Sequence, residues 1–129
     1  LTLAEVEVLA GGVNLAKGAK ASQSSTAFEG APERAIDGNS NGVYIAGSQT
    51  HTEEQTDPWW EVDLGAERPV ETVRVHNRTE GDLGARLDGF VVQAYDANRT
   101  LLFESEAQRA QRTVDVAVMA DPHRRVRLA

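Results

Sequence analysis

Hydrophobic and polar residues alternate along several short runs of this chain. The runs are rich in valine and are separated by Gly, Asn, Asp and Pro, while a sustained helical period of about 3.6 residues is absent. In residues 113–118, for example, valines alternate with Asp115 and Ala117, so one face of a strand would point inward. The runs with this pattern are 3–9, 60–64, 70–76, 90–95, 101–104, 113–118 and 125–128. About seven short strands predict an all-β fold, an antiparallel β-sandwich or jelly roll.

The length and composition set limits on this fold. With 129 residues, the chain can bury the core of one domain, residues 1–129. It contains no cysteine, so disulfides and thiolate metal sites are excluded, and any ion that stabilises the fold would need oxygen ligands. No run approaches the roughly 18 apolar residues that cross a bilayer, which predicts no membrane insertion. The start at Leu1, without Met, suggests a processed chain or a module of a longer protein.

The charge balance argues against two classes of partner. Lys and Arg number 13 and Asp and Glu number 20, which gives a formal net charge of −7. Proteins that bind nucleic acid usually present a basic face to the phosphates, so we expect no nucleic-acid partner. Anionic phospholipid would also repel a chain of this charge.

The common motifs of enzymes are missing from the sequence. It has no G-x-S-x-G, no H-E-x-x-H and no Gly-rich phosphate loop. Glu61 and Asp63 could in principle form the carboxylate pair of a glycosidase. However, they alternate with hydrophobic residues, which predicts the solvated face of a strand. We therefore expect no enzyme activity and no catalytic residues.

The segment 34–51 is too polar and too rich in glycine for a strand, and it predicts a long loop. Within it, Asp37 and Asn39 stand two residues apart in a glycine-rich turn, and Ser48 follows. Calcium prefers about six to eight oxygen ligands at about 2.3–2.6 Å, which the side chains and carbonyls of such a turn can supply. The same pattern also fits an Asx-turn, in which both side chains bind only their own backbone. The motif alone leaves both interpretations open.

Three hydrogen-bonding side chains follow that loop: His51, Arg78 and Arg86. Sugar hydroxyls are recognised by fixed donors and acceptors, and Arg supplies several N–H groups in one plane while neutral His can give or take one bond. The alternative is that both arginines are solvated or pair with nearby acidic residues. Composition alone does not decide between a sugar site and an ordinary surface.

The aromatic residues divide between core and surface. Trp59 and Trp60 begin a predicted strand, and because side chains alternate, at least one of them points inward. We expect Trp60 in the core. Tyr44 lies in the polar loop before His51, where it could form an apolar wall beside a sugar or simply anchor the loop.

Several motifs together resemble the F-type lectins, the fucose-binding branch of the discoidin-like β-jelly-rolls. They are NLAKGAKASQSST, AIDGN, GSQTHT, PWWEVDLG and the strand end V-x-V-H-N-R, and they cover nearly the whole chain. The resemblance implies a non-catalytic, extracellular lectin that binds terminal α-L-fucose on fucosylated glycans. The domain would be free or part of a larger multidomain protein.

The family's sugar motif is matched in part. His51 and Arg78 stand at the family spacing, whereas Glu80 replaces an Asp and Arg86 lies one residue later than the motif places its second basic residue. The resemblance implies that His51, Arg78 and Arg86 bind the sugar hydroxyls and ring oxygen. It also implies that apolar side chains, with Tyr44 among them, pack on the methyl side of fucose.

The resemblance further implies a structural calcium ion and a circular permutation. The opening LTLAEVEVLA is similar to the strand that normally ends the family's chain, while this chain ends at RRVRLA, the strand that normally precedes it. The implied calcium ligands are the side chains of Asp37 and Asn39, Ser48, the carboxylate of Glu5, and the carbonyls of Arg34 and Ala4. Since Glu5 and Asp37 come from distant segments, the ion would tie the first strand to the loop before His51.

A second function is compatible with the same fold class. Discoidin-like domains also act in adhesion, where they bind protein or phospholipid. Relatives that bind membranes generally use exposed apolar loop tips, which are not evident in this sequence. The lectin function is therefore the leading prediction, and adhesion is the alternative.

Overall fold

The computed structural model describes residues 1–38, 50–53, 57–79, 87–118 and 122–129. Its elements in these residues are short strands and one 3-10 helix. They are β1 (Glu5–Ala10), β2 (Val13–Asn14), β3 (Lys20–Gln23), η1 (Pro32–Ala35), β4 (Trp60–Arg68), β5 (Thr72–His76), β6 (Val92–Tyr95), β7 (Leu101–Glu104), β8 (Thr113–Ala117) and β9 (His123–Leu128). No helix among the described residues is long or apolar enough to cross a membrane.

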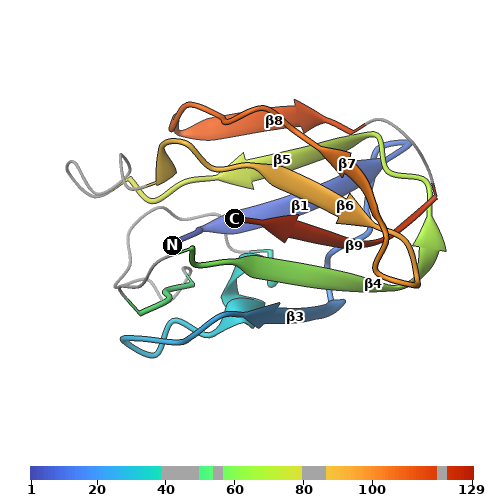
Figure 1. Ribbon diagram of the computed structural model, residues 1–129. Coiled ribbons are helices and arrows are strands. Elements are labelled where there is room, and N and C mark those ends of the chain that lie inside the picture. Colours follow the sequence, from blue (N-terminus) through green and yellow to red (C-terminus); the bar gives the residue numbers. More distant parts are fainter. Residues whose placement is uncertain (39–49, 54–56, 80–86, 119–121) are drawn as a thin grey trace.

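Two antiparallel sheets form the two layers of the molecule (Figure 1). One sheet has the order β2-β1-β5-β8, and the other has the order β3-β4-β9-β6-β7. Every strand pair within them is antiparallel. The predicted all-β sandwich is therefore confirmed.

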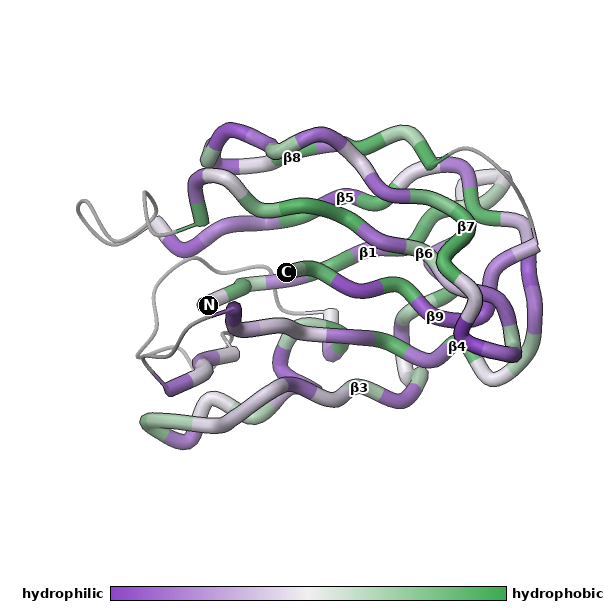
Figure 2. The backbone as a smooth tube through the Cα atoms, viewed as in Figure 1, coloured by the Kyte–Doolittle hydropathy of each residue, from purple (hydrophilic) through white to green (hydrophobic). Residues whose placement is uncertain are grey.

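The alternating pattern located most of the strands. All seven predicted runs overlap a strand, and the run 101–104 matches β7 at both ends. The strands β2 and β3 were missed. β2 is only two residues long, and β3 has the sequence KASQ, in which exposed and half-buried residues alternate without a hydrophobic run. Figure 2 shows the contrast between β3 and the strongly hydrophobic positions of the central strands.

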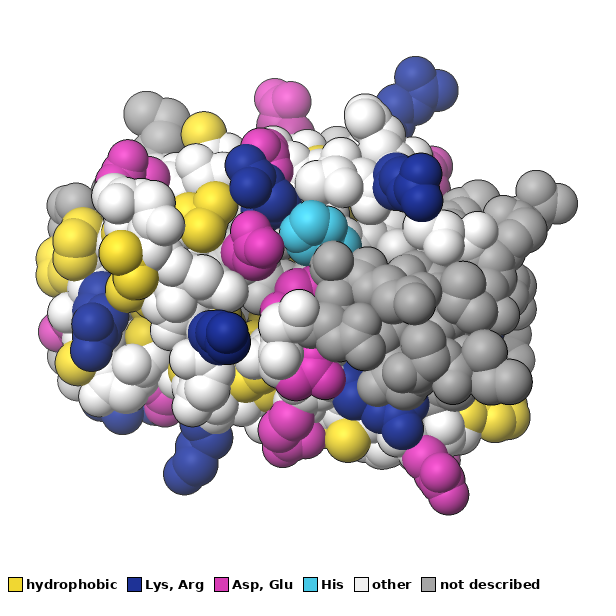
Figure 3. Space-filling model, turned by 180° about the vertical axis from the view of Figure 1, so that it is seen from behind, with side chains coloured by type: hydrophobic (Ala, Val, Ile, Leu, Met, Phe, Trp, Pro, Cys, Tyr) yellow, Lys and Arg dark blue, Asp and Glu magenta, His cyan; other side chains and the backbone are white. Residues whose placement is uncertain are grey.

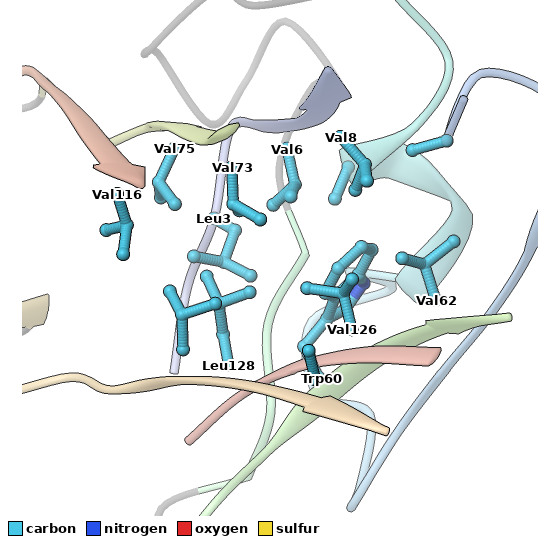
Figure 4. Close-up of a cluster of buried hydrophobic side chains, with 14 of the residues drawn as sticks. Leu3, Val6, Val8, Trp60, Val62, Val73, Val75, Val116, Val126 and Leu128 are labelled. Atoms are coloured by element: carbon cyan, nitrogen blue, oxygen red, sulfur yellow. The ribbon is translucent and has the colours of Figure 1, made fainter. Parts of the chain in front are cut away.

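The core lies between the two sheets and consists mainly of valines and leucines around one tryptophan (Figure 4). Trp60 is fully buried, as predicted, and its indole Nε1 donates a hydrogen bond to the Pro32 carbonyl at 2.9 Å. The strand register aligns inward-facing valines, because Val6 lies opposite Val75 and Val73 lies opposite Val116. Burying one such side chain stabilises the fold by about 1.5–3 kcal/mol.

The outer faces of the sheets carry the charged residues. On the sheet that contains β1, the Arg74 Nε atom lies 2.8 Å from Asp115 Oδ1, and an Arg74 guanidinium nitrogen lies 3.6 Å from Glu7 Oε2. Figure 3 shows acidic and basic side chains interspersed over the face seen from behind. Exposed pairs of this kind contribute little stability, typically about 0–1 kcal/mol each.

On the outer face of β4, one predicted exposure was wrong. Glu61 was expected to be solvated, but it is only 3% exposed. Its carboxylate accepts hydrogen bonds from Arg99 and Arg127, at 2.8–3.1 Å, and those arginines cover it. Asp63 is bound by Arg124 at 2.9 Å, and this hydrogen bond lowers the pKa of Asp63. Ion pairs with Arg127 on β9 and Arg99 in the turn between β6 and β7 therefore bury a carboxylate that the alternating pattern had predicted to be solvated.

The first strand occupies a central place in its sheet, between β2 and β5. Gly11 and Gly12 connect β1 to β2 in a two-residue turn with φ of 56° and 78°, a conformation that favours glycine. Both ends of the chain emerge at the same end of the sandwich (Figure 1), and Leu3 lies near Leu128 in the core (Figure 4). A circular permutation requires such adjacent ends, and it stays a prediction.

Candidate functional site

The predicted residue His51 lies between two buried threonines that hold the start of the chain. Thr50 and Thr52 are 0% and 1% exposed. The Thr50 hydroxyl accepts a hydrogen bond from the Leu3 N–H at 3.0 Å, and the Thr52 hydroxyl accepts one from the amino group of Leu1 at 2.7 Å. Because side chains alternate along an extended segment, two inward threonines direct the intervening His51 outward.

A second segment, 24–31, packs against the other side of His51. The His51 N–H donates to the Gly30 carbonyl at 2.9 Å, and the Ala27 N–H donates to the His51 carbonyl at 2.9 Å. Gly30 is required for this close approach, because a Cβ atom there would lie 2.6 Å from the His51 Cβ atom. His51 is therefore fixed by the start of the chain on one side and by this loop on the other.

The protonation of the His51 ring follows from one contact. Its Nδ1 atom lies 2.6 Å from the Thr52 carbonyl oxygen. A carbonyl can only accept a hydrogen bond, so Nδ1 carries the proton. In the neutral ring, Nε2 is then the nitrogen that can accept a hydrogen bond.

Phe28 forms an aromatic surface beside His51 that was not predicted. Its side chain is 75% exposed, and its ring centroid lies 4.9 Å from that of His51 in an edge-to-face arrangement. A hollow of about 720 Å³ adjoins both rings. Its lining consists of Leu1, Thr2, Ala27, Phe28, His51, Thr52 and Glu53. The signal in the sequence was a single aromatic residue in an otherwise polar stretch.

Arg78 follows the end of β5, and the start of the chain links it to the His51 region. The Arg78 N–H donates to the side chain of Asn77 at 2.7 Å, and Asn77 is 5% exposed. The Ala4 N–H donates to the His76 carbonyl at 2.9 Å, while Leu3 pairs with Thr50. Segment 1–4 therefore contacts both the approach to Arg78 and the residues around His51, so both predicted residues belong to one end of the sandwich.

Four predicted site residues lie outside the described residues. They are Tyr44 and Arg86 of the sugar site and Asn39 and Ser48 of the calcium site. Their roles stay predictions.

Glu5 is the described residue that best fits a cation. It is 2% exposed, its Oε2 atom accepts a hydrogen bond from the Gly38 N–H at 2.9 Å, and Oε1 is buried without a hydrogen-bond partner among the described residues. The pKa of Glu5 is raised from 4.5 to about 8, chiefly by burial and also by the negative charges of Asp37 and Glu7, against the lowering effect of the Gly38 hydrogen bond.

The donor set around Glu5 is consistent with calcium. A buried carboxylate oxygen without a partner costs free energy, and a hard cation with oxygen ligands would remove that cost. Asp37 is next to Gly38 and close enough to act on Glu5, and Arg34 and Ala4 could add carbonyls. Within the described part of the chain, no three His, Cys, Asp or Glu side chains form a metal-binding group. A calcium site would thus depend on carbonyl, amide or hydroxyl oxygens as well.

Residues 34–128 match the protein family described as NedA-like, galactose-binding domain. Among solved structures, a fucose binding module from Streptococcus pneumoniae is 34% identical, with a TM-score of 0.85 over 93% of this chain and 86% of that one. The lectin domain of lectinolysin, solved in complex with Lewis B antigen, is 35% identical, with a TM-score of 0.87 over 90% of this chain and 84% of that one.

Curated relatives match shorter stretches. The fucolectin of Anguilla anguilla is 38% identical over 82 residues, which cover 59% of this chain and 51% of the eel protein. Fucolectin-6 of Anguilla japonica is 45% identical over 56 residues, which cover 43% of this chain and 29% of the relative. The chain thus spans about half or less of the length of these two relatives.

Proposed function

Since the chain belongs to the NedA-like, galactose-binding domain family, in its F-type lectin branch, we propose that it is a non-catalytic lectin domain that binds terminal α-L-fucose on fucosylated glycans. Two similar structures support this proposal, because one is described as a fucose binding module and the other was solved with Lewis B antigen. Each covers at least nine tenths of this chain.

The placement of His51 carries the proposal. The ring is fixed from two sides, presents Nε2 as an acceptor, and stands beside an exposed phenyl ring. A sugar offers hydroxyl donors around an apolar C–H face, so an acceptor next to an aromatic surface is complementary to it. Arg78, at the same end of the sandwich, would donate hydrogen bonds to further sugar oxygens, together with Arg86.

The described carboxylates support a binding role rather than catalysis. A glycosidase needs two carboxyl groups that face the same sugar, one of them able to donate a proton. Glu61 and Asp63 instead form ion pairs with arginines on the outer face of β4. The hydrogen bond from Arg124 lowers the pKa of Asp63 and so favours its charged form.

A structural calcium ion is the second part of the proposal. Glu5 and Asp37 would hold it through their carboxylates, with Asn39, Ser48 and the carbonyls of Arg34 and Ala4 as further ligands. When bound, the ion supplies positive charge that stabilises the ionised carboxylates at the base of the loop before His51. The buried Oε1 atom of Glu5 supports this part.

The setting of the domain is also proposed by similarity. One similar structure, 30% identical with a TM-score of 0.75, is a fucolectin from the serum of the striped bass Morone saxatilis, and this chain covers 42% of it. We infer an extracellular location and a role within a larger protein.

A glycan array tests the function directly. We expect binding to glycans with terminal fucose and none to matched glycans that lack it. Calorimetry with methyl α-L-fucoside, and with methyl α-D-galactoside as the control, then measures the affinity for the monosaccharide. An array without fucosylated hits, together with binding to phospholipid vesicles or protein, would favour the adhesion function instead.

A further inference from the structure

Gln23, the last residue of β3, contacts three points around the candidate site through one amide group. Its Nε2 atom lies 2.9 Å from the Thr26 hydroxyl oxygen and 2.9 Å from the Gly30 carbonyl oxygen. It also lies 3.4 Å from the His51 carbonyl oxygen. Both carbonyls can only accept hydrogen bonds, so the nitrogen and not the oxygen of the amide must face them. The surroundings therefore determine the orientation of Gln23.

The loop that Gln23 contacts has a conformation that other parts of the chain must support. Phe28 and Glu29 have φ of 51° and 59°, in the left-handed region that non-glycine residues seldom occupy. Two consecutive residues with this backbone conformation cost free energy, so the loop would not keep this conformation without contacts from elsewhere. The contacts that keep Phe28 against His51 must therefore come from outside the tip of the loop.

The backbone supplies part of this support. Ala27 and Gly30 each form a hydrogen bond with the backbone of His51, and the Ser25 hydroxyl accepts one from the Glu53 N–H at 2.8 Å. Gln23 adds a different kind of contact, because its single amide binds Thr26 and Gly30, which lie on either side of Phe28. It therefore closes the loop across its base.

The amide oxygen of Gln23 shows that this side chain also carries a cost in stability. Its Oε1 atom is buried and has no hydrogen-bond partner among the described residues. A buried acceptor without a partner is costly, and a hydrophobic side chain of similar size would avoid that cost. The benefit that offsets it is the fixed position of the Thr26–Gly30 turn.

We propose that Gln23 is a positioning residue for sugar binding, which holds the 24–31 loop so that the Phe28 ring stands against His51. The effect on binding rests on the proposed fucose-binding function. The effect on the two rings does not, and it can be measured without any ligand.

The experiment compares Gln23→Leu with the wild-type chain and with Gln93→Leu. Gln93 is a matched control, because it lies on β6 in the same sheet and its amide binds Glu104 and Tyr95, away from the 24–31 loop. Calorimetry measures the Kd for methyl α-L-fucoside at a temperature where all three proteins are folded. Proton NMR follows the His51 ring signals, which the ring current of Phe28 shifts.

For Gln23→Leu we expect a roughly tenfold weaker Kd, the effect of losing about one or two hydrogen bonds, and a clear shift of the His51 ring signals. Gln93→Leu should change neither. A Kd within twofold of the wild type with unmoved His51 signals would overturn the proposal, even if the melting temperature falls.

Gly30→Ala is a second probe, because its Cβ would displace the loop from His51. If the wild-type chain itself binds no fucoside, the proposed function fails, and the His51 signals of Gln23→Leu alone decide the role of Gln23.

Discussion

At the scale of single residues, the position of His51 in the candidate site depends on the two threonines beside it. Thr50 and Thr52 bind the start of the chain and thereby direct His51 outward. The carbonyl of Thr52 then selects the ring nitrogen that carries the proton. If His51 binds a sugar, these contacts orient its ring beforehand, which lowers the entropy cost of binding.

Replacement of His51 tests whether its oriented side chain takes part in fucose binding. We expect His51→Ala to weaken fucose binding by about a hundredfold, since it removes an oriented acceptor and the ring beside Phe28. The melting temperature should change little, because the side chain is only half-buried. His76→Ala is the control, as His76 lies on the outer face of β5 near Glu7. Calorimetry that finds similar losses for both variants would exclude a specific role for His51.

Phe28 gives a second prediction at this scale. Phe28→Ala should weaken fucose binding by about three- to tenfold, the range for one aromatic contact of about 0.5–1.5 kcal/mol. Unfolding by urea should be almost unchanged, because the ring is 75% exposed. Leu101→Ala, at an exposed position of β7, provides the comparison. Unchanged affinity for the fucoside in Phe28→Ala would contradict its proposed contact with the sugar.

At the scale of elements, β1 and the residues before it connect the two candidate sites. Residues 1–3 pair with 50–52, and Glu5 accepts a hydrogen bond from the Gly38 N–H at the other end of the polar loop. If an ion binds Glu5, it would act on the first strand, whose preceding residues pair with the residues around His51. This is the physical route by which an ion could support a sugar site without touching the sugar.

Removal of calcium tests whether an ion at Glu5 stabilises the fold. We expect a chelator to lower the melting temperature of the wild-type chain by several degrees, since a ligand at a hundred times its Kd stabilises by about 2.7 kcal/mol. Glu5→Gln should show little response to the chelator, while Glu104→Gln, on β7, should respond like the wild type. Equal melting temperatures with calcium and with chelator in the wild-type chain would count against the ion.

The buried carboxyl of Glu5 also predicts a pH dependence for the metal-free chain. Burial raises its pKa from 4.5 to about 8, so the folded state holds this proton more tightly than the unfolded state does. Its contribution to stability is fully present below about pH 4.5 and is lost as the pH rises toward 8. In chelator, the stability of the wild type relative to Glu5→Gln should therefore fall between pH 5 and 8, measured by urea unfolding. A constant difference between the two proteins would contradict this.

At the scale of the whole molecule, stability comes from the contact between the two sheets. Leu128 is fully buried and pairs with residues of both neighbouring strands, β4 and β6. Leu128→Ala should lower the free energy of unfolding by about 2–5 kcal/mol, because it leaves a cavity that the surrounding core fills only in part. Leu102→Ala, at a partly exposed position, should change it by less than about 1 kcal/mol. Urea unfolding of both variants makes this comparison.

The sequence by itself determined the fold class, most of the strands and the core position of Trp60. It could do so because burial of one face of a strand imposes a period of two on the chain, and that period is local. The sequence also singled out His51 and Arg78, since their spacing resembles that of a known motif, and their binding of a sugar stays a prediction.

Only the tertiary structure decided the environment of individual side chains. Glu61 became buried because Arg99, in the turn between β6 and β7, and Arg127, on β9, both approach it. Phe28 became part of the site because its loop packs on His51, which lies far from it along the chain. Contacts between distant segments leave no periodic trace in the sequence, so a local pattern can show which residues form a strand but not which charges and rings will meet.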